Sequence, residues 1–388
     1  NNNAQPVSDG VLGTAVGSLT GTTVVAMLAV DVDNGKVWAG YNGTWINSGN
    51  PAAGTGEIAT RTFSSNDAIA VGTAYNGSND QGMFANFGQD STFAGNTAAG
   101  GNSDSNGVGD FKYAVPSGFL ALCSANLPEP VVGPLGDSIS TDNFNTVLWT
   151  GNATGRDITG VGFQPDWVWM KPRSYSDNHV IFDSVRGVNK TLYVNSTGAE
   201  SDRTGNDSLT AFGSDGYTIG NWNNINTNNG TLVAWNWKSG GTAVSNTDGS
   251  VTSQVSANVD AGFSIVSYTG TGSAATIGHG LNAAPEIVIA KVRSTSNNWA
   301  TYVKALGNTK ALLLDTTDGQ LTSSLFWNNT TPTSSVFSVS TGNSVNNSGQ
   351  TYIAYCFHSV DGYSKIGSYT GNGTNQFIYT GFRPAFVM

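Results

Sequence analysis

Residues suited to acid–base or metal chemistry are scarce in this sequence of 388 residues. It contains three histidines and four glutamates, and no spacing among them matches a metal site or a nucleophile–base pair. His179, His279 and His358 lie at the ends of strand-like or turn-like runs, so we expect them to be structural. The sequence therefore predicts a protein without catalytic residues.

Paired carboxylates are the one arrangement that could support catalysis, because two of them can hydrolyse a polysaccharide. Asp166 and Glu286 occupy matching positions in two similar stretches, but the third such stretch has Ala385 there. This difference favours a solvated strand end over a catalytic acid. A polysaccharide depolymerase remains the enzymatic alternative.

Aspartates in polar loops are weak candidates for a metal site. Asp202, Asp207 and Asp215 lie in such loops and could bind a structural calcium ion. Asp31 and Asp33 precede an Asn-Gly dipeptide, and a hairpin turn there accounts for both of them. No other cofactor is expected.

Two tryptophans beside amide side chains are the candidates for ligand binding. Trp222 precedes Asn223, and Trp327 precedes Asn328. An aromatic face can stack on the C–H patches of a sugar while amides hydrogen-bond its hydroxyl groups. Both tryptophans could instead be core residues at strand ends, so both interpretations stay open.

The elements that would position these residues come from a repeated pattern. Three stretches share a glycine turn, a proline and a run of large apolar residues: residues 162–171 (GFQPDWVWMK), 280–291 (GLNAAPEIVIAK) and 381–388 (GFRPAFVM). Proline fits the first position of a strand, and residues two apart lie on one face of it. The pattern predicts a buried strand with Trp167 and Trp169, or Ile287 and Ile289, on one side.

Other blocks recur in the same order. Residues 179–200 align without gaps on residues 299–320, and residues 229–237 parallel residues 348–357. The order indicates that one β module is duplicated and then begins a third time. Because an incomplete sandwich exposes strand edges, we expect more chain after residue 388 or a neighbouring subunit that completes the third copy.

The composition predicts an all-β protein. Charged residues make up 11% of the chain, against about 25% in ordinary soluble domains, and 50 glycines accompany many Asn, Thr and Ser residues. This mixture favours short strands and polar loops. Cys123 and Cys356 lie in apolar runs and are expected to be buried free thiols.

Charge and hydropathy exclude other classes of protein. The net charge is −10 and the basic residues are dispersed, which argues against binding to nucleic acid. The longest apolar run, residues 24–30, is too short to cross a bilayer, so no membrane insertion is expected. No charged segment precedes that run, and no signal peptide is expected.

We expect tandem antiparallel β-sandwiches of the concanavalin or jelly-roll type. In the first of them, residues 24–33, 36–41 and 44–45 should form strands joined by Asn-Gly turns, with further strands at residues 68–71, 83–89 and 118–122. The expected boundaries are a first sandwich at 1–127, a proline linker at 128–135, repeats at 136–241 and 262–360 around a polar linker at 242–261, and the start of a third repeat at 361–388.

Two groups of motifs resemble bacteriophage structural proteins. The Asn-Gly hairpins with residues 51–55 and 86–89 resemble the second half of a SPRY-type β-sandwich, and residues 118–130 resemble the exit of such modules in phage tail proteins. The first half of that sandwich is degenerate or missing. Residues 162–169, 182–187 and 214–218 are similar to a repeat found in tail and fibre proteins of marine phages.

The resemblance implies a non-catalytic protein of the virion surface or extracellular space, such as a tail fibre. Such a protein attaches to a host surface through a glycan or another receptor and contacts other virion proteins. It is commonly a homo-oligomer, often a trimer. The rival hypothesis is a cell-surface adhesin or surface-layer protein of a marine microbe.

Overall fold

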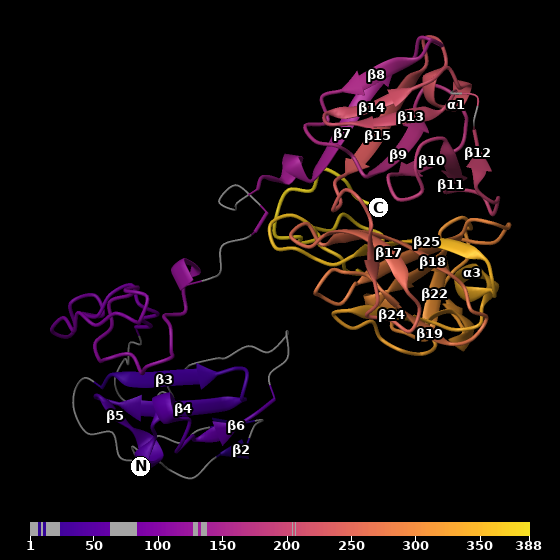
Figure 1. Cartoon of the computed structure of the whole chain (residues 1–388). Helices are drawn as coiled ribbons and strands as arrows, with labels where there is room; N and C mark the ends of the chain where they lie inside the picture. The colour runs from indigo at the N-terminus through magenta and orange to yellow at the C-terminus, as the bar shows by residue number, and fades with distance from the viewer. Residues whose placement is uncertain are drawn as a thin grey trace. The chain divides into compact units, whose positions relative to one another are not determined.

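The computed structural model describes residues 7–8, 11–12, 24–62, 84–126, 131–132, 138–203, 205 and 207–388. The chain divides into two compact units, Asn1–Pro128 and Glu129–Met388, which are described separately (Figure 1). The predicted all-β class is confirmed, since the strands form antiparallel sheets and each α-helix has only four residues. Within the described part of the chain, no helix is long and apolar enough to cross a membrane.

The first unit is organised by the predicted Asn-Gly hairpins. Strand β3 (Ala26–Asp31) pairs with β4 (Lys36–Tyr41), which also pairs with β5 (Thr44–Trp45) and β6 (Ala59–Thr60). A further pair consists of β1 (Val7–Ser8) and β2 (Val11–Leu12). The first turn requires glycine, because a Cβ at Gly35 would lie 2.0 Å from the carbonyl oxygen of Arg61 and φ there is +68°.

The strands predicted at residues 83–89 and 118–122 are wrong for the described residues 84–89 and 118–122, which form loops. Side chains satisfy the backbone there in place of a ladder. The buried Asp104 carboxylate accepts hydrogen bonds from the backbone N–H groups of Asn106, Val108 and Ala121 and from the Asn126 side chain. These bonds hold the pKa of Asp104 at about 2 against the opposing effect of burial. The strand predicted at residues 68–71 lies outside the described residues.

The second unit begins with repeat 1, which is a two-layer sandwich. Its large sheet has six strands in the order β12-β11-β10-β9-β15-β7, and a smaller sheet has the order β13-β14-β8. The strands are β7 (Phe144–Thr150), β8 (Arg156–Thr159), β9 (Trp167–Pro172), β10 (Val180–Asp183), β11 (Lys190–Tyr193), β12 (Ser201–Asp202), β13 (Leu209–Gly213), β14 (Gly216–Ile219) and β15 (Thr231–Trp237), with helix α1 (Asn223–Asn226) before β15.

Repeat 2 is built in the same way. Its large sheet has the order β16-β17-β18-β25-β20-β21-β22-β23, and β19 pairs with β24 in a second layer. The elements are β16 (Val244–Asn246), β17 (Ser253–Asn258), β18 (Phe263–Thr269), β19 (Ala275–Gly278), β20 (Ile287–Val292), β21 (Ala300–Val303), β22 (Lys310–Leu313), β23 (Leu321–Thr322), α2 (Ser324–Trp327), β24 (Val336–Val339), α3 (Asn343–Asn346) and β25 (Thr351–Phe357).

The two repeats share the order and register of the equivalent strands in their large sheets, whereas the second layer of repeat 2 has helix α2 before β24 and, among its described residues, no strand equivalent to β13. Trp167 lies opposite Trp237 in repeat 1, and Ile287 lies opposite Phe357 in repeat 2, so equivalent residues from β9 onward differ by 120 in number. Repeat 2 carries two additional strands, β16 and β17, beyond β18. These strands occupy residues that the sequence analysis treated as a polar linker. That expectation is wrong, because β17 buries Val255 in the core of repeat 2.

The large sheets of the two repeats pack against each other face to face (Figure 1). We call this interface the seam. The ring of Trp167 lies at its centre, 2% exposed and stacked at 4.6 Å on Tyr355. The buried seam residues are Trp167, Trp169, Ile181, Leu192, Val194 and Trp237 of repeat 1 and Phe263, Ile265, Ile289, Trp299, Ile353 and Tyr355 of repeat 2. The apolar side predicted for β9 and β20 therefore faces the matching side of the other repeat.

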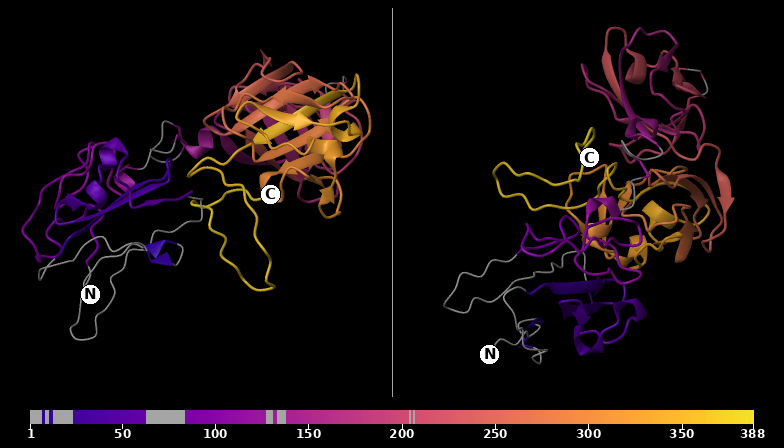
Figure 2. Two further views of the ribbon diagram at one scale, coloured as in Figure 1. Left: turned by 90° about the horizontal axis from the view of Figure 1, so that it is seen from below. Right: turned by 90° about the vertical axis from the view of Figure 1, so that its left-hand side faces the viewer.

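Residues 361–388 contain no named strand and extend from repeat 2 (Figure 2). Phe386 is half-buried, and its ring packs 5.5 Å from the rings of Trp235 and Trp237 at the rim of the seam. Tyr369 and Phe377 are 70% and 88% exposed.

Both cysteines are free, as the sequence analysis expects, but only one of them is buried. Burial raises the pKa of the Cys356 thiol to about 12. Cys123 is half-exposed, because it lies in the loop region of the first unit rather than in the predicted strand.

Candidate functional site

Trp222 lies at the edge of the repeat 1 core, between β14 and α1. Its backbone N–H donates to the carbonyl oxygen of Asp207 (2.8 Å), which fixes the start of the helix. The half-buried indole meets the ring of Tyr193 edge to face at 6.3 Å. Trp222 is thus a rim residue with one part in the core and one part accessible.

Arg203 covers the accessible face of this indole. Its Cζ lies 3.7 Å from the centre of the Trp222 ring, which is a cation–π contact. Nη2 donates to the hydroxyl of Tyr193 (3.3 Å), and Nη1 lies 3.7 Å from Oδ2 of Asp207. A sugar could stack on Trp222 only if the Arg203 side chain moved or bonded to the sugar itself.

Amide groups and a phenol lie beside the indole. Asn223 is exposed, and its carbonyl oxygen accepts the hydroxyl of Tyr175 (2.7 Å). Asn224 is 2% exposed and donates Nδ2 to the carbonyl oxygen of Asn178 (3.3 Å), while its Oδ1 has no partner among the described residues. The cluster combines an aromatic ring, a cation and amides, which suits recognition of hydroxyl groups on a C–H framework.

Repeat 2 provides an internal comparison for this cluster. The residues 120 positions later have small or aliphatic side chains: Trp222 corresponds to Gly342, Tyr193 to Leu313, Arg203 to Ser323 and Tyr175 to Thr295. Because the equivalent strands of the two large sheets have the same order, that sheet does not require the aromatic and cationic side chains. We call Tyr175, Tyr193, Arg203, Trp222 and Asn223 the Trp222 cluster.

Trp327 does not present a sugar-binding face, so its candidacy is wrong. It ends α2 with 2% exposure, and its ring meets that of Tyr302 edge to face in the core of repeat 2. Asn328 is exposed and has a left-handed backbone conformation (φ 52°). The ring of Trp327 is buried and offers no accessible face beside Asn328. The sequence could not separate the two tryptophans, because both stand next to asparagines.

The three candidate metal ligands lie apart. Asp202 forms an ion pair with Lys190, and Asp207 lies near Arg203. Asp215 accepts the backbone N–H groups of Gly160 (3.1 Å) and Gly162 (2.6 Å). In the described ranges, no group of three or more His, Cys, Asp or Glu side chains could hold a metal ion.

The histidines have local hydrogen-bond partners. Nδ1 of His179 accepts the indole N–H of Trp169 (3.0 Å), and burial lowers the pKa of His179. His279 is buried, with Nδ1 accepting the N–H of Leu281 (3.2 Å). Nδ1 of His358 lies 2.8 Å from the carbonyl oxygen of Ser359. These bonds fit the structural role expected for all three.

The expectation of a solvated strand end at Asp166 is wrong, because this side chain is 2% exposed. Its Oδ2 accepts the backbone N–H of Ser239 (2.8 Å), just beyond β15. Glu286 makes the equivalent bond to Ser359 (2.9 Å), just beyond β25. In each repeat a carboxylate therefore fastens the start of the proline-led strand to the end of its neighbour.

A charged group that crosses the seam was not predicted from the sequence. The buried Asp183 carboxylate pairs with Arg186 and accepts the hydroxyl of Tyr355 from repeat 2 (2.6 Å). Glu200 bridges to repeat 2 by accepting both Nε and Nη2 of Arg293 (3.0 and 2.9 Å). Repeat 2 has Val303, Leu306 and Gln320 in the positions of Asp183, Arg186 and Glu200. The sequence did contain a signal for this group, because residues 179–200 and 299–320 align without gaps but differ in charge at these three positions.

A second missed feature is a buried asparagine in each repeat. Oδ1 of Asn226 accepts the N–H of Asn152 (3.0 Å), and its Nδ2 donates to the carbonyl oxygens of Thr154 (2.8 Å) and Gly220 (2.7 Å). Asn346 is likewise fully buried and accepts the N–H of Thr271 (2.7 Å). Each asparagine holds the turn after β7 or its counterpart β18, and the recurrence of an asparagine 120 positions apart, at the last residue of α1 and of α3, could have revealed them.

Lys291 is a buried cation beside the seam. Its Nζ donates to the carbonyl oxygens of Thr197 in repeat 1 (3.0 Å) and Asn297 (2.7 Å). Burial lowers the pKa of Lys291 from 10.5 to about 8. The unfolded chain therefore binds more protons than the folded chain between these two values.

It follows that Lys291 makes the protein more stable as the pH rises from about 8 towards 10. The free energy of unfolding is measured by urea denaturation at pH 7.5 and at pH 9.5. We expect its increase between the two pH values to be smaller in Lys291→Met than in wild type by roughly 1–3 kcal/mol. Lys171→Met, at the equivalent half-exposed position, is the matched control. Equal pH dependence of wild type and Lys291→Met would contradict the lowered pKa.

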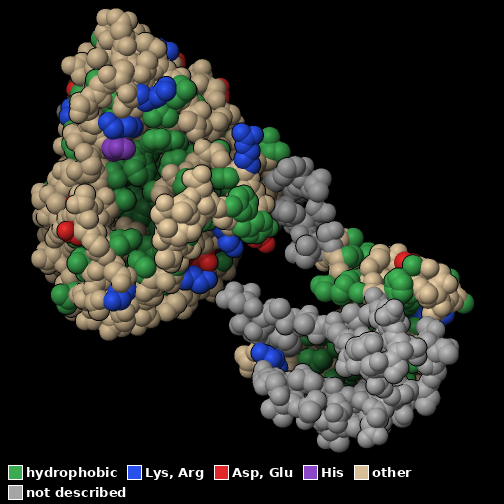
Figure 3. All heavy atoms as spheres, turned by 180° about the vertical axis from the view of Figure 1, so that it is seen from behind, with side chains coloured by type: hydrophobic (Ala, Val, Ile, Leu, Met, Phe, Trp, Pro, Cys, Tyr) green, Lys and Arg blue, Asp and Glu red, His purple; other side chains and the backbone are tan. Residues whose placement is uncertain are grey.

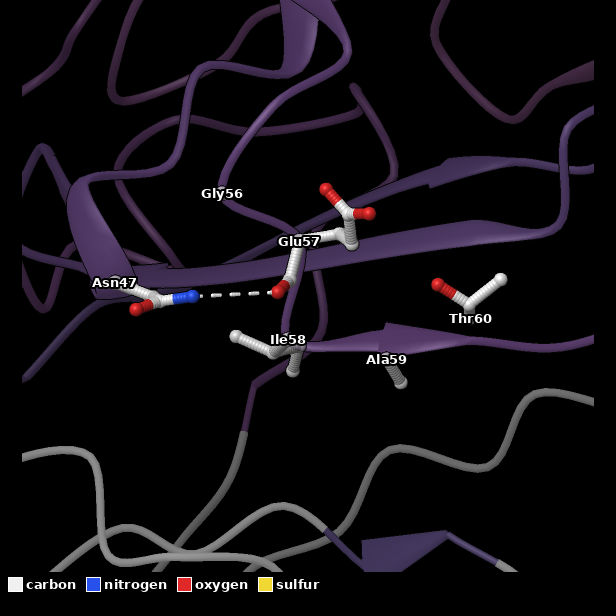
Figure 4. A pocket seen from close by; sticks show the side chains of 6 residues that line it. All are labelled: Asn47, Gly56, Glu57, Ile58, Ala59 and Thr60. Carbon is white, nitrogen blue, oxygen red and sulfur yellow. Dashed lines mark hydrogen bonds between the residues drawn. The ribbon is translucent and has the colours of Figure 1, made fainter.

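The first unit contains an open depression lined by Asn47, Glu57, Ile58 and their neighbours (Figure 4). Nδ2 of Asn47 donates to the carbonyl oxygen of Glu57 (3.4 Å), and the Glu57 carboxylate lies 3.5 Å from Nζ of Lys36. Figure 4 shows the Asn47 side chain turned towards this backbone carbonyl and the Glu57 carboxylate away from it. The lining groups do not converge, so we place no site here.

The surface in Figure 3 carries few charges. Lys, Arg, Asp and Glu side chains are scattered over the second unit, and most of that view consists of uncharged polar side chains and backbone, with a hollow that has hydrophobic side chains at its base. This fits the 11% of charged residues in the sequence.

Comparison with known proteins identifies one family. Its model, described as a domain of unknown function (DUF7483), matches residues 139–388. The chain belongs to the DUF7483 family. The match covers both repeats, the seam and residues 361–388, so the Trp222 cluster lies inside the DUF7483 region. No curated protein matches this chain, and no solved structure matches it.

Proposed function

We propose that this protein is a non-catalytic structural component of a virion surface, of the tail-fibre kind, and that repeat 1 contributes to host attachment by binding a glycan. The observation that carries the proposal is the difference between the repeats at the Trp222 cluster. Repeat 2 keeps the equivalent large-sheet strands and the counterpart of β14, with Gly342 at the position of Trp222 and Ser323, the N-cap of α2, at the position of Arg203. Side chains that the fold does not need are candidates for a function.

The packing of the second unit supports a structural role. The seam buries large aromatic rings, and the Arg293–Glu200 ion pair and the hydrogen bond from Tyr355 to Asp183 cross it. The repeats are thereby held in one arrangement, which suits the display of a binding surface. The sparse charge leaves hydroxyl and amide groups as the main surface chemistry.

The binding role is tested with the purified chain on an array of bacterial surface glycans. We expect a defined subset of glycans to bind, and Trp222→Ala to weaken that binding about tenfold or more, because aromatic stacking is lost. Phe377→Ala, which removes an 88% exposed ring elsewhere, should bind like wild type. Equal binding by wild type and Trp222→Ala would refute the assigned site.

Location on the virion surface is tested separately by immunogold labelling of particles and cells from a lysed source culture. Label on virions supports the proposal, whereas label confined to the cell envelope would favour an adhesin or surface-layer protein. Release of reducing ends from a bound polysaccharide would contradict the non-catalytic assignment.

A further inference from the structure

Strand β7 leaves a long sheet edge open in repeat 1. It is the terminal strand of the six-stranded sheet and pairs only with β15 among the described residues. It has seven residues, whereas the other edge strands of the two large sheets, β12, β16 and β23, have two, three and two. Short edge strands are one way in which proteins prevent pairing with other chains, and β7 lacks this protection.

Nor does β7 carry the other usual protections. Its sequence, FNTVLWT, contains no charged residue and no proline. Leu148 is 59% exposed, and Thr146 and Thr150 are exposed as well. The strand is therefore an uncharged edge with a large apolar side chain at its surface.

Repeat 2 shows that this position of the fold accepts another strand. Strand β18 is the counterpart of β7, and β17 pairs along its outer edge, with Ser256 opposite Ile265 and Gln254 opposite Ser267. Val266 of β18 is fully buried, whereas its counterpart Val147 is half-buried. The edge of β7 is thus less covered than the same edge in repeat 2.

Two backbone hydrogen bonds at the ends of β7 show which of its backbone groups face β15 and which face outward. The carbonyl oxygen of Asn143 accepts the N–H of Lys238 (2.9 Å), and the N–H of Gly151 donates to the carbonyl oxygen of Gly230 (2.7 Å). Odd-numbered residues therefore face β15, and the backbone groups of Phe144, Thr146, Leu148 and Thr150 face outward. Side chains hold two of these groups: Oδ1 of Asn145 accepts the N–H of Thr146 (2.9 Å), and Nη1 of Arg156 donates to the carbonyl oxygen of Thr150 (3.1 Å).

We propose that β7 pairs antiparallel with β7 of a second copy of this chain, which joins two six-stranded sheets into one. The strand is self-complementary in this register. With Val147 on the twofold axis, Thr146 lies opposite Leu148 of the second copy, and outward-facing residues meet outward-facing residues. Closed twofold pairing is the commonest symmetry of soluble oligomers, and β7 itself contributes no charged side chain. The Arg156 guanidinium must leave the Thr150 carbonyl oxygen before Thr150 pairs with Phe144 of the second copy.

This proposal does not depend on glycan binding. It predicts a dimer with twice the chain mass of 40.2 kDa, measured by light scattering or sedimentation up to about 100 µM. Leu148→Lys should raise the dissociation constant of the dimer about tenfold or more, because the ammonium group must be desolvated at the joined edge. Val244→Lys, on the short edge strand β16 where Val244 is 65% exposed, should leave it unchanged.

A cysteine variant tests the register. In a Cys123→Ser background, Val147→Cys should form a disulfide-linked dimer under mild oxidation, because opposite residues of a non-hydrogen-bonded pair lie about 4.5 Å apart at Cα. Thr146→Lys provides a second edge variant if Leu148→Lys folds poorly by circular dichroism. A chain that stays monomeric, a trimer, or a dimer insensitive to both edge variants would overturn the proposal.

Discussion

Trp167→Ala is expected to lower the free energy of unfolding by about 3–5 kcal/mol in urea denaturation. The ring is 2% exposed and lies within 6 Å of Trp169, Trp237, Phe263 and Tyr355 in the seam. Removal of the indole leaves a cavity between two sheets, and neither sheet can close it without breaking its own ladder.

Two further variants define the effect. Trp167→Phe should cost less than half as much, since it keeps most of the stacking and removes an indole N–H that has no partner among the described residues. Tyr369→Ala, at a ring that is 70% exposed, should stay within about 0.5 kcal/mol of wild type. A loss below about 1 kcal/mol for Trp167→Ala would mean that the face of β9 is solvated.

Arg186→Leu is expected to destabilise the chain by about 3–5 kcal/mol, because it leaves Asp183 as a buried charge without a cation. Both side chains have no exposed surface. The guanidinium also donates to the carbonyl oxygen of Ile181 (3.1 Å) and to Glu200 (3.2 Å), so its loss leaves several acceptors unsatisfied.

Repeat 2 supplies the control for this variant. It has Val303 and Leu306 at the equivalent positions, and the sandwich keeps its strands there. The combined variant Asp183→Val, Arg186→Leu and Tyr355→Phe should therefore recover most of the lost stability in the same denaturation experiment, since it removes the buried charge and its partner together. A combined variant as unstable as Arg186→Leu alone would show that the charges themselves hold the seam.

The repeated strands could be read from the sequence because their determinants are local. Proline at 165 and 285 stands two residues before each strand, and alternation places Trp167 with Trp169 and Ile287 with Ile289 on one side. What faces that side is not local information. An apolar face is equally compatible with a core layer or with a second repeat, and only the assembled structure shows that Trp167 stacks on Tyr355.

Only part of the candidate site could be predicted from the sequence, because local neighbours do not show whether a side chain is buried. Trp222 and Trp327 have similar neighbours in the sequence, but one lies at the rim and the other in the core. The sequence predicts a solvated strand end at Asp166 because the third stretch has Ala385 at the matching position, whereas the bond from Asp166 to Ser239 joins residues 73 positions apart. Burial of a polar side chain depends on such distant partners, which a pattern of neighbours does not contain.

The central claim is that the seam makes the two repeats one cooperative unit. Hydrogen exchange of the full chain, followed by mass spectrometry of peptides from β15 and β25, tests it most directly. Both strands are expected to open with the same free energy, and Trp167→Ala is expected to lower this free energy equally in both. A loss of protection confined to β15, with β25 unchanged, would contradict it.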